Sequence, residues 1–117
     1  MSTAKIYHNP RCSKSRATLE LLKSKHDDIE IIKYLDTPPS TSEIENLLQQ
    51  LNLNIRDILR KNEPEFKENN LSNPEFSSEQ LVKLTNQYPK VLERPIVSYN
   101  NRAIIGRPPE NVLELFK

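Results

Sequence analysis

The first 35 residues carry three segments in the order strand, helix, strand, and this order limits the possible folds more than any other feature. Residues 4–8 form an apolar run too short for a helix, and residues 13–25 place apolar side chains at helical spacing. Residues 29–35 are rich in β-branched side chains. Strands joined in this way pair in parallel through a right-handed crossover. The turn after the first strand then lies at the carboxyl edge of the sheet, where open α/β folds bind ligands.

The middle of the chain has the pattern of a helical insertion. Ser40 with Glu43, and Ser77 with Gln80, form capping boxes that predict the starts of two helices. Asn54 is placed to cap a further short helix between them.

From Pro95 onward the pattern returns to strands. Residues 96–99 and 102–105 flank two asparagines, which tolerate the backbone angles of a tight turn, and together they predict a β-hairpin. A last helix is expected at about residues 109–116.

We therefore predict one α/β domain over residues 1–117, with a helical insertion at about residues 38–90. Its mixed sheet combines the βαβ unit with a C-terminal ββα unit. A chain of 117 residues can bury a modest core without disulfide or metal support.

Composition excludes several classes of protein. The net charge is +1 and acids and bases are interspersed, so the basic stripe of nucleic-acid-binding proteins is missing. A single glycine excludes glycine-rich phosphate loops, and one cysteine with two histidines cannot form a zinc site of usual spacing or an internal disulfide. The sequence shows neither a signal peptide nor a transmembrane run. We expect a cytoplasmic protein that binds neither nucleic acid nor membrane.

The only cysteine, Cys12, falls where the helix of residues 13–25 is predicted to begin. A lone cysteine is more often a small buried apolar residue than a nucleophile. The neighbours of this one are instead polar and cationic: Arg11, Ser13, Lys14, Ser15 and Arg16. A helix N-terminus offers unpaired N–H groups and partial positive charge, and with nearby cations it stabilises a thiolate or holds an oxyanion. Cys12 is therefore the candidate nucleophile.

The two histidines differ in their expected importance. His8 ends the first strand, close enough through the turn to act on the thiol, although a histidine there can also be an ordinary strand-end residue. His26 follows the helix, and we expect it on the surface.

Arg60, Arg94 and Arg107 each fall at the end of a predicted element or in a connection. Taken singly, each would more often be a solvated surface residue, but a guanidinium suits bidentate recognition of a tetrahedral oxyanion. Arg94 and Arg107 each precede a proline, which restricts the backbone beside them. A phosphatase-type loop, with an arginine six positions after the cysteine, is absent because Thr18 stands there.

Five motifs, in order and over essentially the whole chain, resemble the glutaredoxin-coupled arsenate reductase family, its short chromosomal members in particular. The motifs are His8-Asn9-Pro10-Arg11-Cys12-Ser13-Lys14-Ser15-Arg16, Tyr34-Leu35 before Thr37-Pro38-Pro39, Leu59-Arg60-Lys61, Glu93-Arg94-Pro95-Ile96-Val97 and Ile105-Gly106-Arg107-Pro108. Five separate motifs are far more specific than any one of them. The resemblance implies a thioredoxin-like fold with a helical insertion.

The resemblance also implies roles for individual residues. Cys12 would be the nucleophile that attacks arsenate, with His8 nearby as the modulator of its ionisation. The oxyanion and its cysteinyl adduct would be bound by Arg60, Arg94 and Arg107.

Four further residues would support the site: Asn9, Ser15, Arg16 and Pro95, the last at the cis-proline position that faces the cysteine in this fold. Reduction of arsenate takes two electrons, and the chain has no second thiol to complete it. The resemblance implies glutathione as an external cosubstrate and glutaredoxin as the partner that resolves the mixed disulfide. We expect a monomer with no bound cofactor or metal.

Two functions of other classes stay open. Spx-type regulators share the fold and parts of the motifs, bind RNA polymerase and sense oxidation through two cysteines spaced C-x-x-C. Ser15 stands at the second of these positions, so no internal redox switch can form, although not every member of that group needs the pair. The other alternative is a glutaredoxin-like protein that handles mixed disulfides with glutathione. The three arginines argue against it, because a disulfide has no tetrahedral oxyanion for them to hold.

Overall fold

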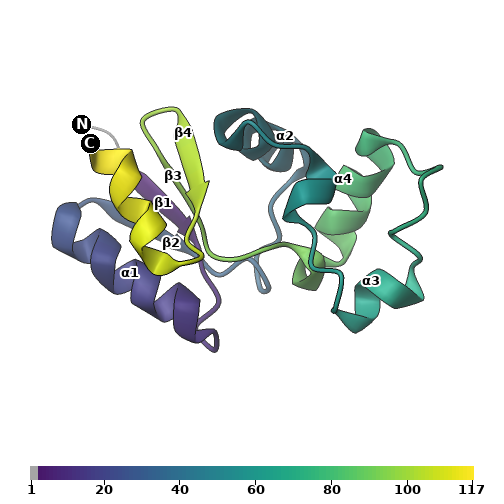
Figure 1. Ribbon diagram of the computed structural model, residues 1–117, viewed down its shortest axis with the longest axis horizontal. Coiled ribbons are helices and arrows are strands. Elements are labelled where there is room, and N and C mark those ends of the chain that lie inside the picture. The colour runs from purple at the N-terminus through teal and green to yellow at the C-terminus, as the bar shows by residue number, and fades with distance from the viewer. Residues whose placement is uncertain (1–2) are drawn as a thin grey trace. The chain divides into compact units, whose positions relative to one another are not determined.

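The computed structural model describes residues 3–117 (Figure 1). The chain divides into two compact units, and the first joins the N-terminal segment up to Thr37 with Arg94–Lys117. The second unit is Pro38–Glu93, and the helical insertion expected at about residues 38–90 falls within it. The single domain over the whole chain stays a prediction.

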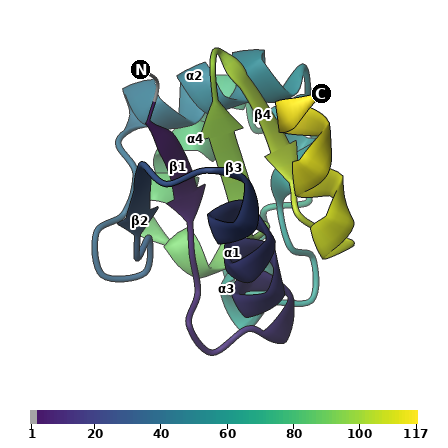
Figure 2. The same cartoon turned by 90° about the vertical axis from the view of Figure 1, so that its left-hand side faces the viewer.

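The first unit contains a mixed sheet of four strands, as the sequence predicts (Figure 2). Strands β1 (Ala4–Tyr7) and β2 (Ile29–Ile32) pair in parallel on either side of helix α1 (Ser13–Lys25) in the sequence. Strand β3 (Ile96–Tyr99) runs antiparallel to both β1 and β4 (Arg102–Ile105), which gives the order β2–β1–β3–β4. The βαβ unit therefore continues into the C-terminal ββα unit within one sheet.

Strand β2 is shorter than the sequence suggests. It ends at Ile32, three residues before the predicted end at Leu35. The reason is a turn, because the carbonyl of Lys33 accepts hydrogen bonds from the backbone N–H groups of both Asp36 and Thr37, each at 2.9 Å. The β-branched run predicts the strand but not this turn.

Helix α1 and the 3₁₀-helix η3 (Pro109–Phe116) cover the same face of the sheet (Figures 1 and 2). The apolar core lies between these helices and the strands, and its residues are Ala4, Ile6, Leu19, Leu22, Val97, Val112 and Leu115. The predicted last helix is thus present, in the tighter 3₁₀ form.

His26 is half-buried, and the prediction that it lies on the surface is wrong. Its ring centroid is 4.8 Å from that of Tyr99 and 5.8 Å from that of Phe116. The end of α1 returns toward β3 and η3, so the imidazole completes an apolar cluster at the rim of the core.

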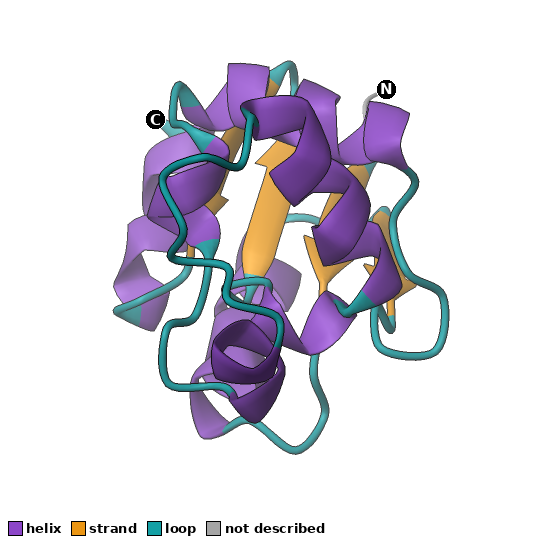
Figure 3. Ribbon diagram, turned by 90° about the vertical axis from the view of Figure 1, so that its right-hand side faces the viewer, coloured by secondary structure: helices purple, strands orange, loops and turns teal. Residues whose placement is uncertain are grey.

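The second unit is built from helices and loops (Figure 3). Its helices are α2 (Thr41–Leu51), η1 (Ile55–Ile58), α3 (Pro64–Glu68), α4 (Ser78–Gln87) and η2 (Pro89–Val91). Both predicted capping boxes are formed: Ser40 Oγ accepts from the Glu43 N–H at 3.1 Å, and Ser77 Oγ accepts from the Gln80 N–H at 3.2 Å. The short helix α3 was not predicted, because a single turn that begins at a proline leaves no periodic signal.

Among residues 3–117, no helix has the length and apolar character needed to cross a lipid bilayer.

The hairpin turn yields a prediction about stability. Asn100 and Asn101 have positive φ values of 53° and 63°, the left-handed conformation of a type I′ turn. Replacing Asn101 by alanine should lower the free energy of unfolding by about 1 kcal/mol, because a Cβ without a compensating polar group disfavours that conformation. Denaturant unfolding of Asn101→Ala would measure the loss, and Asn101→Gly should not show it.

The matched control is Asn62→Ala, an exposed turn asparagine outside the positive-φ set. It should change stability by less than about 0.5 kcal/mol. Equal losses in Asn101→Ala and Asn62→Ala would contradict the conformational explanation.

Candidate active site

Cys12 occupies the N-cap position of α1, where the sequence analysis places it. Its backbone is extended, and its carbonyl accepts the first helical hydrogen bond, from the Arg16 N–H at 3.0 Å. The thiol is partly buried and is not in a disulfide. The N–H groups of the first turn lie just beyond it along the chain, so the sulfur sits at the positive end of the helix.

The turn before α1 is held by its own polar groups. The Asn9 carbonyl accepts from the Cys12 N–H at 3.0 Å, and the Asn9 N–H donates to Ser15 Oγ at 3.0 Å. Arg16 Nη1 donates to the Pro10 carbonyl at 2.8 Å. Asn9, Ser15 and Arg16, three of the four residues that the resemblance suggests as support, thus fix the backbone that carries Cys12.

His8 is bound to Ser15. Its side chain is only 6% exposed, and Nδ1 lies 2.7 Å from Ser15 Oγ. Burial lowers the pKa of His8 below its ordinary value of 6.5, and the positive charges of Lys33, Arg16 and Lys23 lower it further. The imidazole is therefore neutral at pH 7. Its predicted action on the thiol stays a prediction.

Arg107 brings a positive charge to the thiol. Its Nη1 lies 3.9 Å from Cys12 Sγ and 3.3 Å from the carbonyl oxygen of Arg94. Arg94 contributes at least its carbonyl to this arrangement and, like Arg107, is partly buried. The peptide bonds before Pro95 and Pro108 are both cis. The first unit therefore brings together the predicted nucleophile and one predicted arginine, with the backbone of a second.

Arg60 belongs to the second unit, where two carboxylates hold its guanidinium. Nη1 lies 2.8 Å from Glu63 Oε1, and Nε lies 3.7 Å from Glu93 Oε1. The backbone builds this arrangement, because the Arg60 N–H donates to the Val91 carbonyl at 2.6 Å and the segments around Leu59 and Leu92 pair antiparallel. The Arg60 side chain is 23% exposed, so these ion pairs are partly shielded from water.

Three residues of the first unit, Thr18, Gly106 and Asn111, contact the site but were not predicted to belong to it. Asn111 Nδ2 donates to the carbonyls of Ile105 and Arg107 at 3.3 and 3.2 Å. Thr18 Oγ1 lies 3.2 Å from the carbonyl oxygen of Gly106. The one available signal was that Gly106 is the only glycine of the chain.

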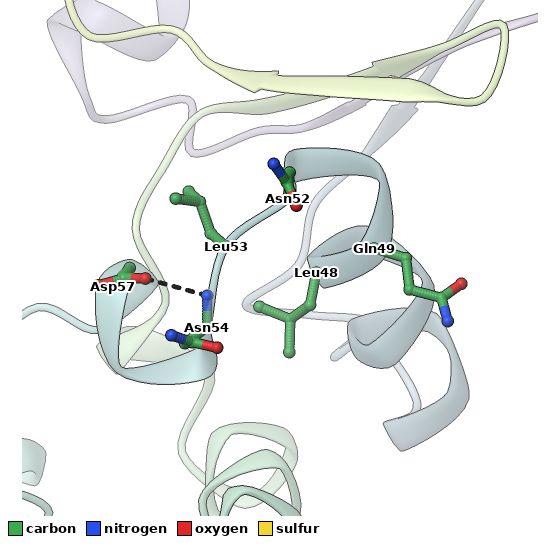
Figure 4. Close-up of a pocket in the computed structure, with 6 residues that line it drawn as sticks. All are labelled: Leu48, Gln49, Asn52, Leu53, Asn54 and Asp57. Carbon is green, nitrogen blue, oxygen red and sulfur yellow. Dashed lines mark hydrogen bonds between the residues drawn. The ribbon is translucent and has the colours of Figure 1, made fainter.

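A hollow in the second unit is a weaker candidate. Its walls are Leu48, Gln49, Asn52, Leu53, Asn54 and Asp57 (Figure 4). Its single carboxylate is engaged as a helix cap, since Asp57 Oδ2 accepts from the Asn54 N–H at 3.0 Å. The residues that line the hollow include no nucleophile and no cation. The surroundings of Cys12 are therefore the better candidate for a reaction with an anion. Within residues 3–117, no group of three or more His, Cys, Asp or Glu side chains is arranged to hold a metal ion.

The mixed four-stranded sheet, with α1 and η3 on one face and a cysteine at the start of the first helix, defines a thioredoxin-like protein. The model of the ArsC family matches residues 7–115, and the chain belongs to that family. The fold predicted from the sequence is confirmed.

Similar proteins cover nearly the full length. An Escherichia coli protein named "Uncharacterized protein YfgD" is 48% identical over 95% of this chain and 94% of its own. An arsenate reductase of Neisseria meningitidis is 44% identical over 96% of this chain and 97% of its own. The solved structure of an arsenate reductase from Vibrio cholerae is 47% identical, covers 97% of each chain and superposes with a TM-score of 0.92.

The environment of His8 predicts a dependence of stability on pH. Because its pKa is lower in the folded state than the ordinary 6.5, the unfolded chain takes up the proton first as the pH falls. Its contribution to stability is complete above pH 6.5 and is lost as the pH falls below that value. The free energy of unfolding should therefore decline between pH 7 and 5.5, as measured by urea titration at each pH.

The variant His8→Asn places an amide near the position of Nδ1 and cannot titrate, so the decline should be smaller in this protein. His26→Asn removes the other histidine and serves as the matched control. Because His8 is still present in this variant, the part of the decline in the free energy of unfolding that comes from His8 should remain. An undiminished decline in His8→Asn would contradict the burial argument.

Proposed function

We propose that this protein is an arsenate reductase that uses Cys12 as its nucleophile, with glutathione and glutaredoxin as external thiol donors. The observation that carries the proposal is the 3.9 Å separation between Arg107 Nη1 and Cys12 Sγ at the N-terminus of α1. A thiol at a helix N-terminus beside a guanidinium suits attack on a tetrahedral oxyanion, because both groups stabilise negative charge. The relatives from Neisseria meningitidis and Vibrio cholerae, which carry this name, support the choice of arsenate.

The chemistry balances with one protein thiol. The Cys12 thiolate attacks arsenic, an S–As bond forms, and one arsenate oxygen leaves as water, while arsenic stays at +5. The sulfur of glutathione then attacks the Cys12 sulfur. The S–As bond breaks with its electron pair going to arsenic, which leaves as arsenite at +3, and the two sulfurs remain as a mixed disulfide. A glutaredoxin thiolate attacks the glutathione sulfur and releases Cys12.

The arginines have distinct parts in this proposal. Arg107 faces the sulfur and stabilises both the thiolate and the charged adduct. Arg94 and Arg60 are assigned to the oxyanion on the strength of their motifs. In Arg60 the guanidinium is already shared with Glu63 and Glu93, so an oxyanion has to compete with these carboxylates for it. His8 and Ser15 hold the turn that presents the thiol.

A first experiment tests the source of electrons. With protein and arsenate alone, at most one equivalent of adduct should form, because the chain has a single cysteine. Turnover should require glutathione and glutaredoxin together, followed as NADPH oxidation through glutathione reductase, and mass spectrometry of the stalled protein should place arsenic or glutathione on Cys12. Cys12→Ser is the control without activity. Sustained turnover with thioredoxin as the sole thiol source would overturn the mechanism.

A second experiment tests the arginines. Replacement of Arg60, Arg94 or Arg107 by alanine should lower arsenate turnover at least about tenfold, because each removes charge-assisted hydrogen bonds to the anion or the adduct. Lysine should rescue poorly, since a point charge does not reproduce a planar fork. Arg102→Ala is the matched control, because this exposed arginine binds the carbonyls of Glu114 and Leu115. Full activity in all three alanine variants would refute the assigned oxyanion site.

A further inference from the structure

We propose that Thr18 is a positioning residue. Its contact with Gly106 fixes the backbone of Gly106 and Arg107, here called the Arg107 segment, and so sets where the guanidinium lies relative to the Cys12 thiol. The inference rests on the proposed function only in giving Arg107 a role at the sulfur. It concerns the first unit alone, which contains all the residues involved.

The side chain of Thr18 lies fully buried between α1 and the end of β4. Its hydroxyl donates to the carbonyl of Lys14 at 2.8 Å, the usual bond of a helical threonine to the preceding turn. The same oxygen lies 3.2 Å from the carbonyl oxygen of Gly106, 88 residues further along the chain. The hydroxyl proton is therefore shared between the helix and the segment that leads to Arg107.

Gly106 allows this close approach because it lacks a side chain. A Cβ at this residue would lie 2.5 Å from Thr18 Oγ1, 2.8 Å from Thr18 Cγ2 and 2.9 Å from Pro95 Cγ, all closer than real Cβ atoms come to their neighbours. Its φ is not positive, so the requirement for glycine comes from space and not from the backbone angle. The fit of Gly106 between Thr18 and Pro95 thus fixes the distance between α1 and this segment.

The rest of the segment is held from other sides. The Gly106 N–H donates to the Pro95 carbonyl at 2.9 Å, and Asn111 holds the carbonyl of Arg107 at 3.2 Å. The Arg107 guanidinium is in turn bound to the Arg94 carbonyl at 3.3 Å. With the backbone fixed on both sides of Arg107, its Nη1 has a defined place 3.9 Å from the sulfur.

Helix α1 therefore positions both Cys12 and Arg107. It presents Cys12 at its N-cap and, six residues later, holds the segment of Arg107 through Thr18. This is the position at which a phosphatase-type loop would carry its own arginine. Here the cation comes from a distant segment, and the residue at that position sets its location.

The test compares two alkylating reagents on the single cysteine. Iodoacetate is an anion and iodoacetamide is neutral, and both react with the same thiolate, so the ratio of their rates reports the charge beside the sulfur and not the amount of thiolate. A nearby guanidinium raises this ratio. Arg107→Ala should lower it about threefold to fivefold, the effect of one charge at contact distance near water. This readout requires no arsenate, so it is separate from turnover.

Thr18→Val keeps the shape of the side chain but loses the hydroxyl, and it should lower the ratio about as far as Arg107→Ala does. Thr18→Ser restores the hydroxyl and should keep the wild-type ratio. In the Arg107→Ala background, Thr18→Val should have no further effect, because both changes act through the same guanidinium. The matched control is Thr85→Val in α4, a fully buried threonine whose hydroxyl donates to the Leu81 carbonyl at 2.7 Å.

Asn111→Ala provides a second route should Thr18→Val fail to fold. It releases the Arg107 segment from the opposite side and should lower the ratio in the same direction. An unchanged ratio in folded Thr18→Val, or an equal drop when Arg107 is already absent, would overturn the positioning role. An unchanged ratio in Arg107→Ala would overturn it as well. If the wild-type protein did not turn over arsenate, that result would count only against the proposed reaction.

Discussion

The packing of α1 and η3 on one face of the sheet is the constraint on which the rest of the first unit depends. Ile6 and Leu22 are fully buried at this contact, and truncation of such a side chain costs about 2–5 kcal/mol. Because the helix is anchored along its length, its N-terminus has a fixed place at the carboxyl end of β1. The apolar packing thus places the end of the helix, and the polar contacts of Asn9, Ser15 and Arg16 fix the turn that carries the thiol.

Local patterns predicted most elements because the cause of each lies within a few residues. The capping boxes at Ser40 and Ser77, the asparagine pair of the hairpin and the limits of α1 follow from neighbours in the sequence. The turn at Lys33 that shortens β2 and the burial of His26 do not, since both depend on how the folded chain returns on itself. The residues of the candidate site differ in the same way. Cys12 could be predicted from its neighbours in the sequence, and the arginines could be predicted from the motifs in which they stand. The contacts of Thr18, Gly106 and Asn111 join positions that only the tertiary structure brings together.

The charges around the two groups of site residues are balanced differently. Near the thiol, the Arg107 guanidinium lies 3.9 Å from the Cys12 sulfur, which favours negative charge on that sulfur. Around Arg60, the carboxylates of Glu63 and Glu93 both contact the guanidinium, so a further anion has to compete with them.

The contact between Arg107 and Cys12 joins residues 95 positions apart, and the first unit consists of two segments separated by the whole second unit. Contacts at such separation form late, because the intervening chain has to be closed into a loop first. During synthesis the thiol leaves the ribosome long before its guanidinium partner does. In a nascent or truncated chain the sulfur therefore lacks the guanidinium of Arg107, which reaches it only once the C-terminal segment has docked.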